Sequence, residues 1–261
     1  MTLAFIAALA YLLAAGLLAR GVARDGHGRA WLLPTVVALV LHAALHVMTW
    51  REAGALDLHF FSALSLVGLG MAALTTLFGA GGRMAALGVL VFPIAAGVAV
   101  AYAMRGHVTA AEPLDWRLQL HAWCALLAYA TLGIAAVLAV FLWAQERALR
   151  RREFHGWLRA LPPLTELESL LFRTIAVGFA LLTATLLTGV LFVENLFAQH
   201  LVHKTVLSVL SWLVFGGLLL GRWRRGWRGA KAVRWTLVAM TLLLLAFFGS
   251  QFVLEMVLKR V

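Results

Sequence analysis

The chain has few charged residues and a single cysteine. Of its 261 residues, 13% are charged and 63% are hydrophobic. Because about a quarter of a typical soluble domain is charged, this composition excludes an ordinary soluble fold and requires that most of the chain lies in lipid. Cys124 is the only cysteine, so no intrachain disulfide and no Cys-x-x-Cys redox pair can form.

Long apolar runs account for most of the chain, and each is long enough to cross a bilayer. We predict an all-α polytopic membrane bundle that forms one transmembrane domain over residues 1–261. The first run has no basic residues before it, which indicates a first span and not a cleaved signal peptide. Thr165 followed by Glu168 is a capping-box pattern that predicts a helix start near Glu166. The eight predicted spans are about 2–19, 31–48, 58–78, 85–103, 118–143, 174–193, 205–221 and 235–256.

The basic residues alternate between the two sides of this bundle. The segments after spans one, three, five and seven carry 16 of the 22 lysines and arginines. The positive-inside rule therefore predicts that these segments are cytoplasmic and that both termini face outward. The net charge of +11 suggests contact with anionic lipid, not with nucleic acid. The arginines predicted to make this contact are Arg150, Arg151, Arg152, Arg222, Arg224 and Arg225.

The nine histidines are unevenly distributed in this topology. Only His27 and His155 fall in predicted cytoplasmic loops. His42 lies roughly 12 Å below the outer end of its span, with His46 one turn above it, and His121 opens a charge-free span. Intramembrane ionisable residues are functional candidates, although a neutral histidine can also simply hydrogen-bond to a neighbouring helix. The histidines in the predicted outer half are His42, His46, His59, His107, His121, His200 and His203.

Three kinds of chemistry would suit these histidines. Zinc usually takes three or four ligands, and the outer carboxylates do not form a compact ligand motif with the histidines. A proton relay usually needs buried carboxylates as well. Haem needs only one or two axial imidazoles and an apolar pocket, so haem fits these residues best. The outer carboxylates are Glu52, Asp57, Glu112, Asp115 and Glu194.

A recognisable motif adds to this interpretation. Residues 121–130, HAWCALLAYA, resemble the His-x(7)-Tyr-Ala signature of the cytochrome c assembly family, the haem-handling membrane proteins that include CcsA, CcmC and HemX-like proteins. The resemblance continues through 161–192, 203–235 and 244–254, and it is closest to a short eight-span branch found in the bacterial inner membrane. It implies a multi-pass inner-membrane protein that binds haem b and acts as an accessory factor in cytochrome c biogenesis, alongside other membrane proteins of that process.

The resemblance also implies specific ligands. His121 matches the outer axial histidine of the family, and His42 matches the histidine of the second span, so we expect these two to ligate the haem iron. His203 and His46 are further candidates. The propionates would face outward, towards a basic residue there. No catalytic residue is predicted; a small-ligand or ion permease and a non-catalytic scaffold or regulator remain alternatives. The outer basic residues considered for the propionates are Arg51, Arg105, Arg117 and Lys204.

Overall fold

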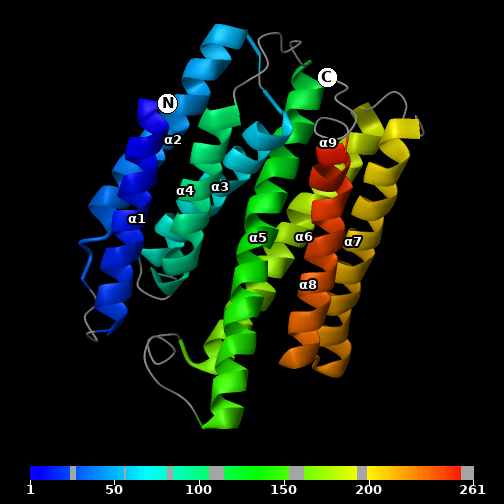
Figure 1. Ribbon diagram of the computed structural model, residues 1–261. Helices are drawn as coiled ribbons and strands as arrows, with labels where there is room; N and C mark the ends of the chain where they lie inside the picture. Colours follow the sequence, from blue (N-terminus) through cyan, green and yellow to red (C-terminus); the bar gives the residue numbers. More distant parts are fainter. Residues whose placement is uncertain are drawn as a thin grey trace. The chain divides into compact units, whose positions relative to one another are not determined.

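In the computed structural model the described residues form helices joined by short connections, and none of them forms a strand (Figure 1). Inside a bilayer the backbone cannot hydrogen-bond to water, and a helix satisfies every interior N–H and C=O within its own segment. Eight helices are long and apolar enough to span a membrane. The all-α, eight-span prediction is therefore confirmed. The description covers residues 1–23, 28–55, 57–80, 85–105, 115–152, 162–192 and 199–253, so His27, His107, His155, Glu112 and Glu194 lie outside it.

The chain divides into two compact units, which are described separately. Unit 1 comprises residues 1–113 and 147–163. In it, α1 packs against α2 and α4, and α3 packs against α4. Alanines fill much of the interior, as expected where membrane helices approach closely. The helices are α1 (Thr2–Ala23), α2 (Leu32–Ala53), α3 (Phe60–Gly79) and α4 (Gly88–Arg105), with a 3₁₀ turn η1 (Ala85–Leu87) before α4.

Unit 2 comprises residues 114–146 and 164–261. In it, α7 packs against both α6 and α8. The helix α5 begins in unit 2 and its last residues belong to unit 1. That the whole chain forms one domain stays a prediction. The helices are α5 (Trp116–Arg151), α6 (Leu164–Phe192), α7 (Gln199–Arg225), α8 (Ala230–Leu244), the π-turn η3 (Leu245–Gly249) and α9 (Ser250–Phe252).

Helix α6 runs antiparallel to α5 in unit 2. Two close contacts along the seam where these helices meet show which residues lie opposite one another. A Cβ added at Gly178 would lie 2.5 Å from the side chain of Leu132, so glycine is needed for this approach. Further along the same seam, the His121 ring lies against Gly189. The shared seam places the start of α5 beside the end of α6, where the candidate site lies.

Several helices extend past the apolar runs that predicted them. With 36 residues, α5 is about 54 Å long, whereas the hydrocarbon core is only about 30 Å thick. Helix α6 begins at Leu164, two residues before Glu166 and so close to the predicted start. Only the capping role was wrong, because Thr165 already lies within the helix. Glu168 is instead buried and pairs with arginines of unit 2.

This buried carboxylate joins the start of α6 to the turn between α7 and α8. Glu168 Oε1 lies 2.5 Å from Nη1 of Arg222, and Oε2 lies 3.5 Å from Nε of Arg228. Arg222 also donates to the carbonyl of Trp227 at 3.2 Å. A buried charge without such partners would carry a large desolvation penalty, so these contacts explain how an ionisable residue is tolerated there.

The tyrosine of the signature motif contacts an irregular part of the last span. Tyr129 donates from its hydroxyl to the carbonyl of Leu243 at 2.5 Å, just before the π-turn η3. Its ring meets Phe248 edge-on, with centroids 5.4 Å apart. Because π-turns shift the hydrogen-bond register of a helix, a carbonyl near one is available to a side-chain donor. Tyr129 therefore ties α5 to the last span.

An even number of spans is consistent with the predicted topology, in which both termini face outward. The structure contains no membrane, so the outward orientation of the termini stays a prediction.

Candidate functional site

His121 lies in the second turn of α5 and is held by α6. Its Nδ1 lies 3.0 Å from the carbonyl oxygen of Thr185 and 3.2 Å from Oγ1 of Thr188. A carbonyl can only accept, so Nδ1 must carry the hydrogen. In a neutral ring the lone pair is then on Nε2. Among the described residues Nε2 has no hydrogen-bond partner, and the side chain is only partly buried. His121 therefore presents an oriented nitrogen ligand.

The sequence of α6 explains how this pocket forms. Thr185 and Thr188 are three residues apart, so they share one helix face. Thr188 donates its own hydroxyl hydrogen to the carbonyl of Ala184 at 2.8 Å, which leaves its oxygen to accept from the histidine. Gly189 supplies the space for the ring, because a Cβ there would lie 3.2 Å from Cε1 of His121. None of these three α6 residues was predicted, because their contacts with His121 join two different helices.

One turn before His121, a guanidinium lies among aromatic rings. The Cζ atom of Arg117 is 5.6 Å from the centroid of the Trp116 ring and 5.9 Å from that of Phe192. The two rings are 6.2 Å apart and tilted by 56°. Arg117 also pairs with Asp115 at 4.0 Å, but both side chains are more than half exposed. Such surface pairs contribute little.

His42 has a different environment, in the interior of unit 1. It is completely buried; Nδ1 lies 3.3 Å from the hydroxyl of Tyr11 and Nε2 lies 2.8 Å from Oγ of Ser65. Both ring nitrogens are therefore engaged by hydroxyl groups. Binding a metal at either nitrogen would release one of these bonds, and leaving a buried polar group unpaired costs about 1–3 kcal/mol.

His46 joins the same cluster from one turn away. Its Nε2 lies 3.0 Å from the same Ser65 oxygen, and its ring stacks on Tyr102 with centroids 4.6 Å apart. A serine hydroxyl has one hydrogen to donate, so at least one of the two histidines must donate to Ser65. The structure thus brings the two predicted histidines of α2 together through a serine of α3, with His42 and His46 stacked 5.6 Å apart.

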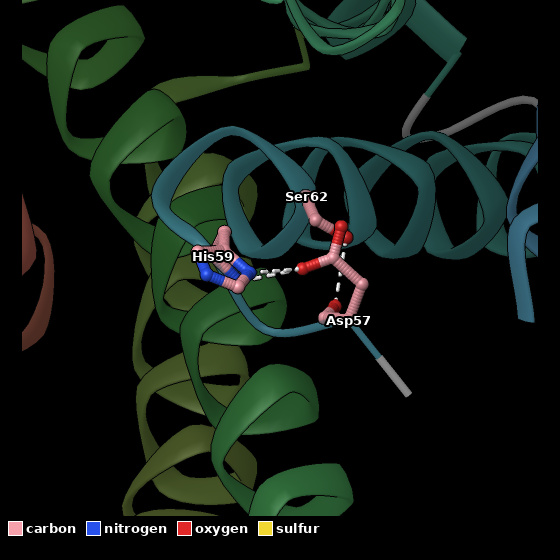
Figure 2. Close-up of polar contacts among 3 residues, drawn as sticks. All are labelled: Asp57, His59 and Ser62. Atoms are coloured by element: carbon pink, nitrogen blue, oxygen red, sulfur yellow. Dashed lines mark hydrogen bonds and ion pairs between the residues drawn. The ribbon is translucent and has the colours of Figure 1, made fainter. Parts of the chain in front are cut away.

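A carboxylate–histidine pair lies at the start of α3 (Figure 2). Asp57 is buried, and its Oδ1 accepts from Nδ1 of His59 at 2.6 Å and from the backbone N–H of His59 at 3.0 Å. The hydroxyl of Ser62 donates to the Asp57 carbonyl at 2.8 Å. The carboxylate therefore orients the His59 ring and accepts the backbone N–H of the residue that precedes α3. The sequence alone indicates Asp57 only as one of the outer carboxylates.

The remaining candidates are spread over other helices. His203 is exposed near the start of α7, and Lys204 beside it donates to Oε1 of Gln251 at 2.9 Å. Arg105 lies over the ring of Phe61, 5.5 Å from its centroid. Within the described ranges, no group of three or more His, Cys, Asp or Glu side chains could hold a metal ion.

The arginines predicted to contact lipid differ in how available they are. Arg150, Arg151 and Arg152 at the end of α5 are exposed, as are Arg224 and Arg225. In contrast, Arg222 is engaged by Glu168 and by a backbone carbonyl. Lipid contact stays a prediction, and this geometry favours the exposed arginines for it.

Comparison with known proteins places this geometry in context. The family model described as cytochrome C assembly protein matches residues 30–258. The chain belongs to this family. The resemblance carried by the signature at 121–130 is therefore confirmed, and the membership supports a role in cytochrome c biogenesis or haem handling. No solved structure matches the chain significantly.

Three relatives show how far the similarity extends. Inner membrane protein YpjD of Escherichia coli K12 is 31% identical over 265 residues, which cover 97% of this chain and 98% of the relative. Protein HemX of Brevibacillus brevis is 25% identical over 131 residues, covering 49% and 48%. Cytochrome c biogenesis protein CcsA of Prochlorococcus marinus is 29% identical over 89 residues, covering 33% and 28%. With eight membrane-spanning helices, the chain is a multi-pass protein of the bacterial inner membrane.

Proposed function

We propose that this protein binds haem b through His121 and acts as an accessory factor in cytochrome c biogenesis. The observation that carries the proposal is the fixed tautomer of His121: the Thr185 carbonyl binds Nδ1–H and leaves the Nε2 lone pair available. A metal-binding histidine almost always donates its other N–H to a carbonyl or carboxylate, which orients the ring and raises its basicity. Family membership supports haem as the ligand.

The metal-binding side chains of the described residues suit haem better than a bare metal ion. Within the described ranges there is no cluster of three metal-binding side chains, whereas haem brings four nitrogen ligands of its own and needs one or two from the protein. A covalent attachment motif of the Cys-x-x-Cys-His type cannot form because Cys124 is the only cysteine. Bound haem would supply a redox-active iron; His121 would hold that iron, and the apolar helix faces would cover the ring.

Three histidines are candidates for the second axial ligand. His42 is the residue that the sequence favours, with His203 and His46 as further candidates. In unit 1, His42 already uses both nitrogens, so ligation would require Tyr11 or Ser65 to release it. His203 is exposed on α7 and has no hydrogen-bond partner among the described residues. Spectra of the single variants can separate these candidates, because each changes a different ligand.

The test is an absorption measurement on protein purified in detergent after expression with ample haem. The Soret absorbance per mole of protein is compared for wild type, His121→Ala, His42→Ala, His46→Ala and His203→Ala, with His155→Ala as the control. We expect His121→Ala to lose the Soret band or to show a changed ligation spectrum, and the control to match wild type. A variant at the true second ligand should show a five-coordinate spectrum. Full haem loading of His121→Ala, or haem-free wild type, would contradict the proposal and favour a scaffold or regulator.

A further inference from the structure

We propose that Arg117, with the rings of Trp116 and Phe192, selects the ligand of the His121 site by binding a free carboxylate of a flat, aromatic macrocycle. This inference rests on the proposed function, because it assumes that His121 holds the iron of such a molecule. It adds a specificity-determining residue and a ligand class: tetrapyrroles whose propionates are ionised, as opposed to neutral, esterified ones.

Arg117 lies close to His121 on α5. The two residues are four apart on α5, so they lie one above the other on the same face of the helix. Each also meets α6 along the same antiparallel seam: His121 contacts Thr188 and Arg117 contacts Phe192. A ligand held at Nε2 of His121 therefore has a guanidinium one helical turn away.

The guanidinium of Arg117 is available to bind a carboxylate of a ligand. Its only ion pair among the described residues is with Asp115, at 4.0 Å through Nε, and both side chains are more than half exposed. The carboxylate of Asp115 is in turn used by the backbone N–H of Trp116 at 2.8 Å. The two terminal nitrogens of Arg117 remain able to form the paired hydrogen bonds with which arginine recognises carboxylates.

Two aromatic rings lie beside the guanidinium of Arg117. Stacking on Trp116 and Phe192 holds the Arg117 side chain at the helix ends, which reduces the freedom that it would lose on binding. Trp116 is 63% exposed, so its indole presents an uncovered aromatic surface. A tryptophan at a helix end can also serve as an interfacial anchor. Trp116 differs from a simple anchor because a guanidinium lies beside it and the oriented His121 lies one turn away.

A lipid phosphate could also bind an exposed arginine, so the test uses ligands that differ only at the carboxylates. The full-length protein in one detergent is titrated with haem and with haem dimethyl ester, whose propionates carry no charge. The quantity compared is the ratio of the two dissociation constants for each variant. Because both ligands partition into the same micelles for every protein, the change in this ratio reports the protein's contribution.

We expect wild type to prefer haem over its ester by roughly tenfold or more, the strength of a charge-assisted hydrogen bond. Arg117→Gln should lose most of this preference and keep the axial-ligand spectrum of His121. Trp116→Leu should weaken binding of both ligands alike. The matched control is Arg150→Gln, an exposed arginine at the other end of the same helix, which should keep the wild-type ratio. If Arg117→Gln does not fold, Arg117→Met retains the apolar stem against the rings and removes the same charge.

The outcomes separate the two proposals. A wild-type ratio in the folded neutral variant, or an equal loss in Arg150→Gln, would overturn the role of Arg117 while leaving His121 as the ligand. Failure of wild type and of the Arg150→Gln control to bind either compound would overturn the haem-binding function, and the selection by Arg117 with it.

Discussion

His121 in unit 2 and His42 in unit 1 use their ring nitrogens in different ways. The Nδ1 of His121 faces a carbonyl, which can only accept, so one tautomer is enforced and Nε2 is left to a ligand. The nitrogens of His42 face two hydroxyl groups, which can donate or accept, so either tautomer is satisfied and neither nitrogen is spare. The difference teaches that membrane depth alone does not identify a ligand; the chemistry of the partners does.

The surroundings of the two histidines differ in the same sense. His42 is completely buried, and its neighbours His46 and Tyr11 are polar residues of the same unit. His121 is only partly buried, with Gly189 leaving space beside its ring and Arg117 one turn away. One site resembles a satisfied polar core, which rigidifies a bundle. The other has the features of a binding site.

The largest expected effect is on the reporter signals that show on which side of the membrane each loop lies. The comparison depends on this topology, because the distribution of basic residues is what places both histidines in the outer half of the membrane. Reporter fusions after Arg152 and after Arg225 should report a cytoplasmic location, and a fusion after Ala110 should report an external one. The signals are close to all-or-none. A reversed pattern at any of the three positions would remove the argument that the two histidines share a side.

The next effect concerns the stability of unit 1. Ser65→Ala removes the oxygen that both His42 and His46 contact, so buried ring nitrogens lose their partner. We expect a loss of about 1–3 kcal/mol in the free energy of unfolding, measured by thermal unfolding in detergent. Thr76→Val is the matched control on the same helix, because its hydroxyl only donates to the Ala72 carbonyl. An equal loss in both variants would show that the serine has no special role.

The smallest effect concerns the partners of His121. Thr188→Val removes the longer of the two contacts to Nδ1, while the Thr185 carbonyl still accepts the hydrogen. We expect the haem affinity to fall by less than about fivefold, which corresponds to less than about 1 kcal/mol. Thr174→Val, whose hydroxyl donates to its own helix at Leu170, should leave the affinity unchanged. A loss as complete as that of His121→Ala would mean that the threonine, and not the carbonyl, orients the ring.

The sequence-based predictions were accurate for features that hydrophobicity alone decides. They were less accurate for features that also depend on contacts with other helices. Runs of apolar residues located all eight spans, because lipid imposes a length and a composition on each. The helix ends were predicted less evenly. Helix α5 continues to Arg151, since a helix need not stop where hydrophobicity does, whereas α6 begins at Leu164, two residues from the predicted start. Glu168 illustrates the failure, because its local pattern suggested a cap and its long-range partners made it a buried ion pair.

By itself, the sequence determined that this is an eight-span helical membrane protein of the cytochrome c assembly family and that His121 belongs to its signature. Composition, run length and a motif within one helix are local properties, so no folding is needed to read them. Tertiary structure alone decided that His121 has a spare nitrogen and His42 does not. The deciding partners, Thr185 and Ser65, come from other helices, 64 and 23 residues away in the chain. A hydrogen bond acts over about 3 Å, so only packing can establish which groups meet.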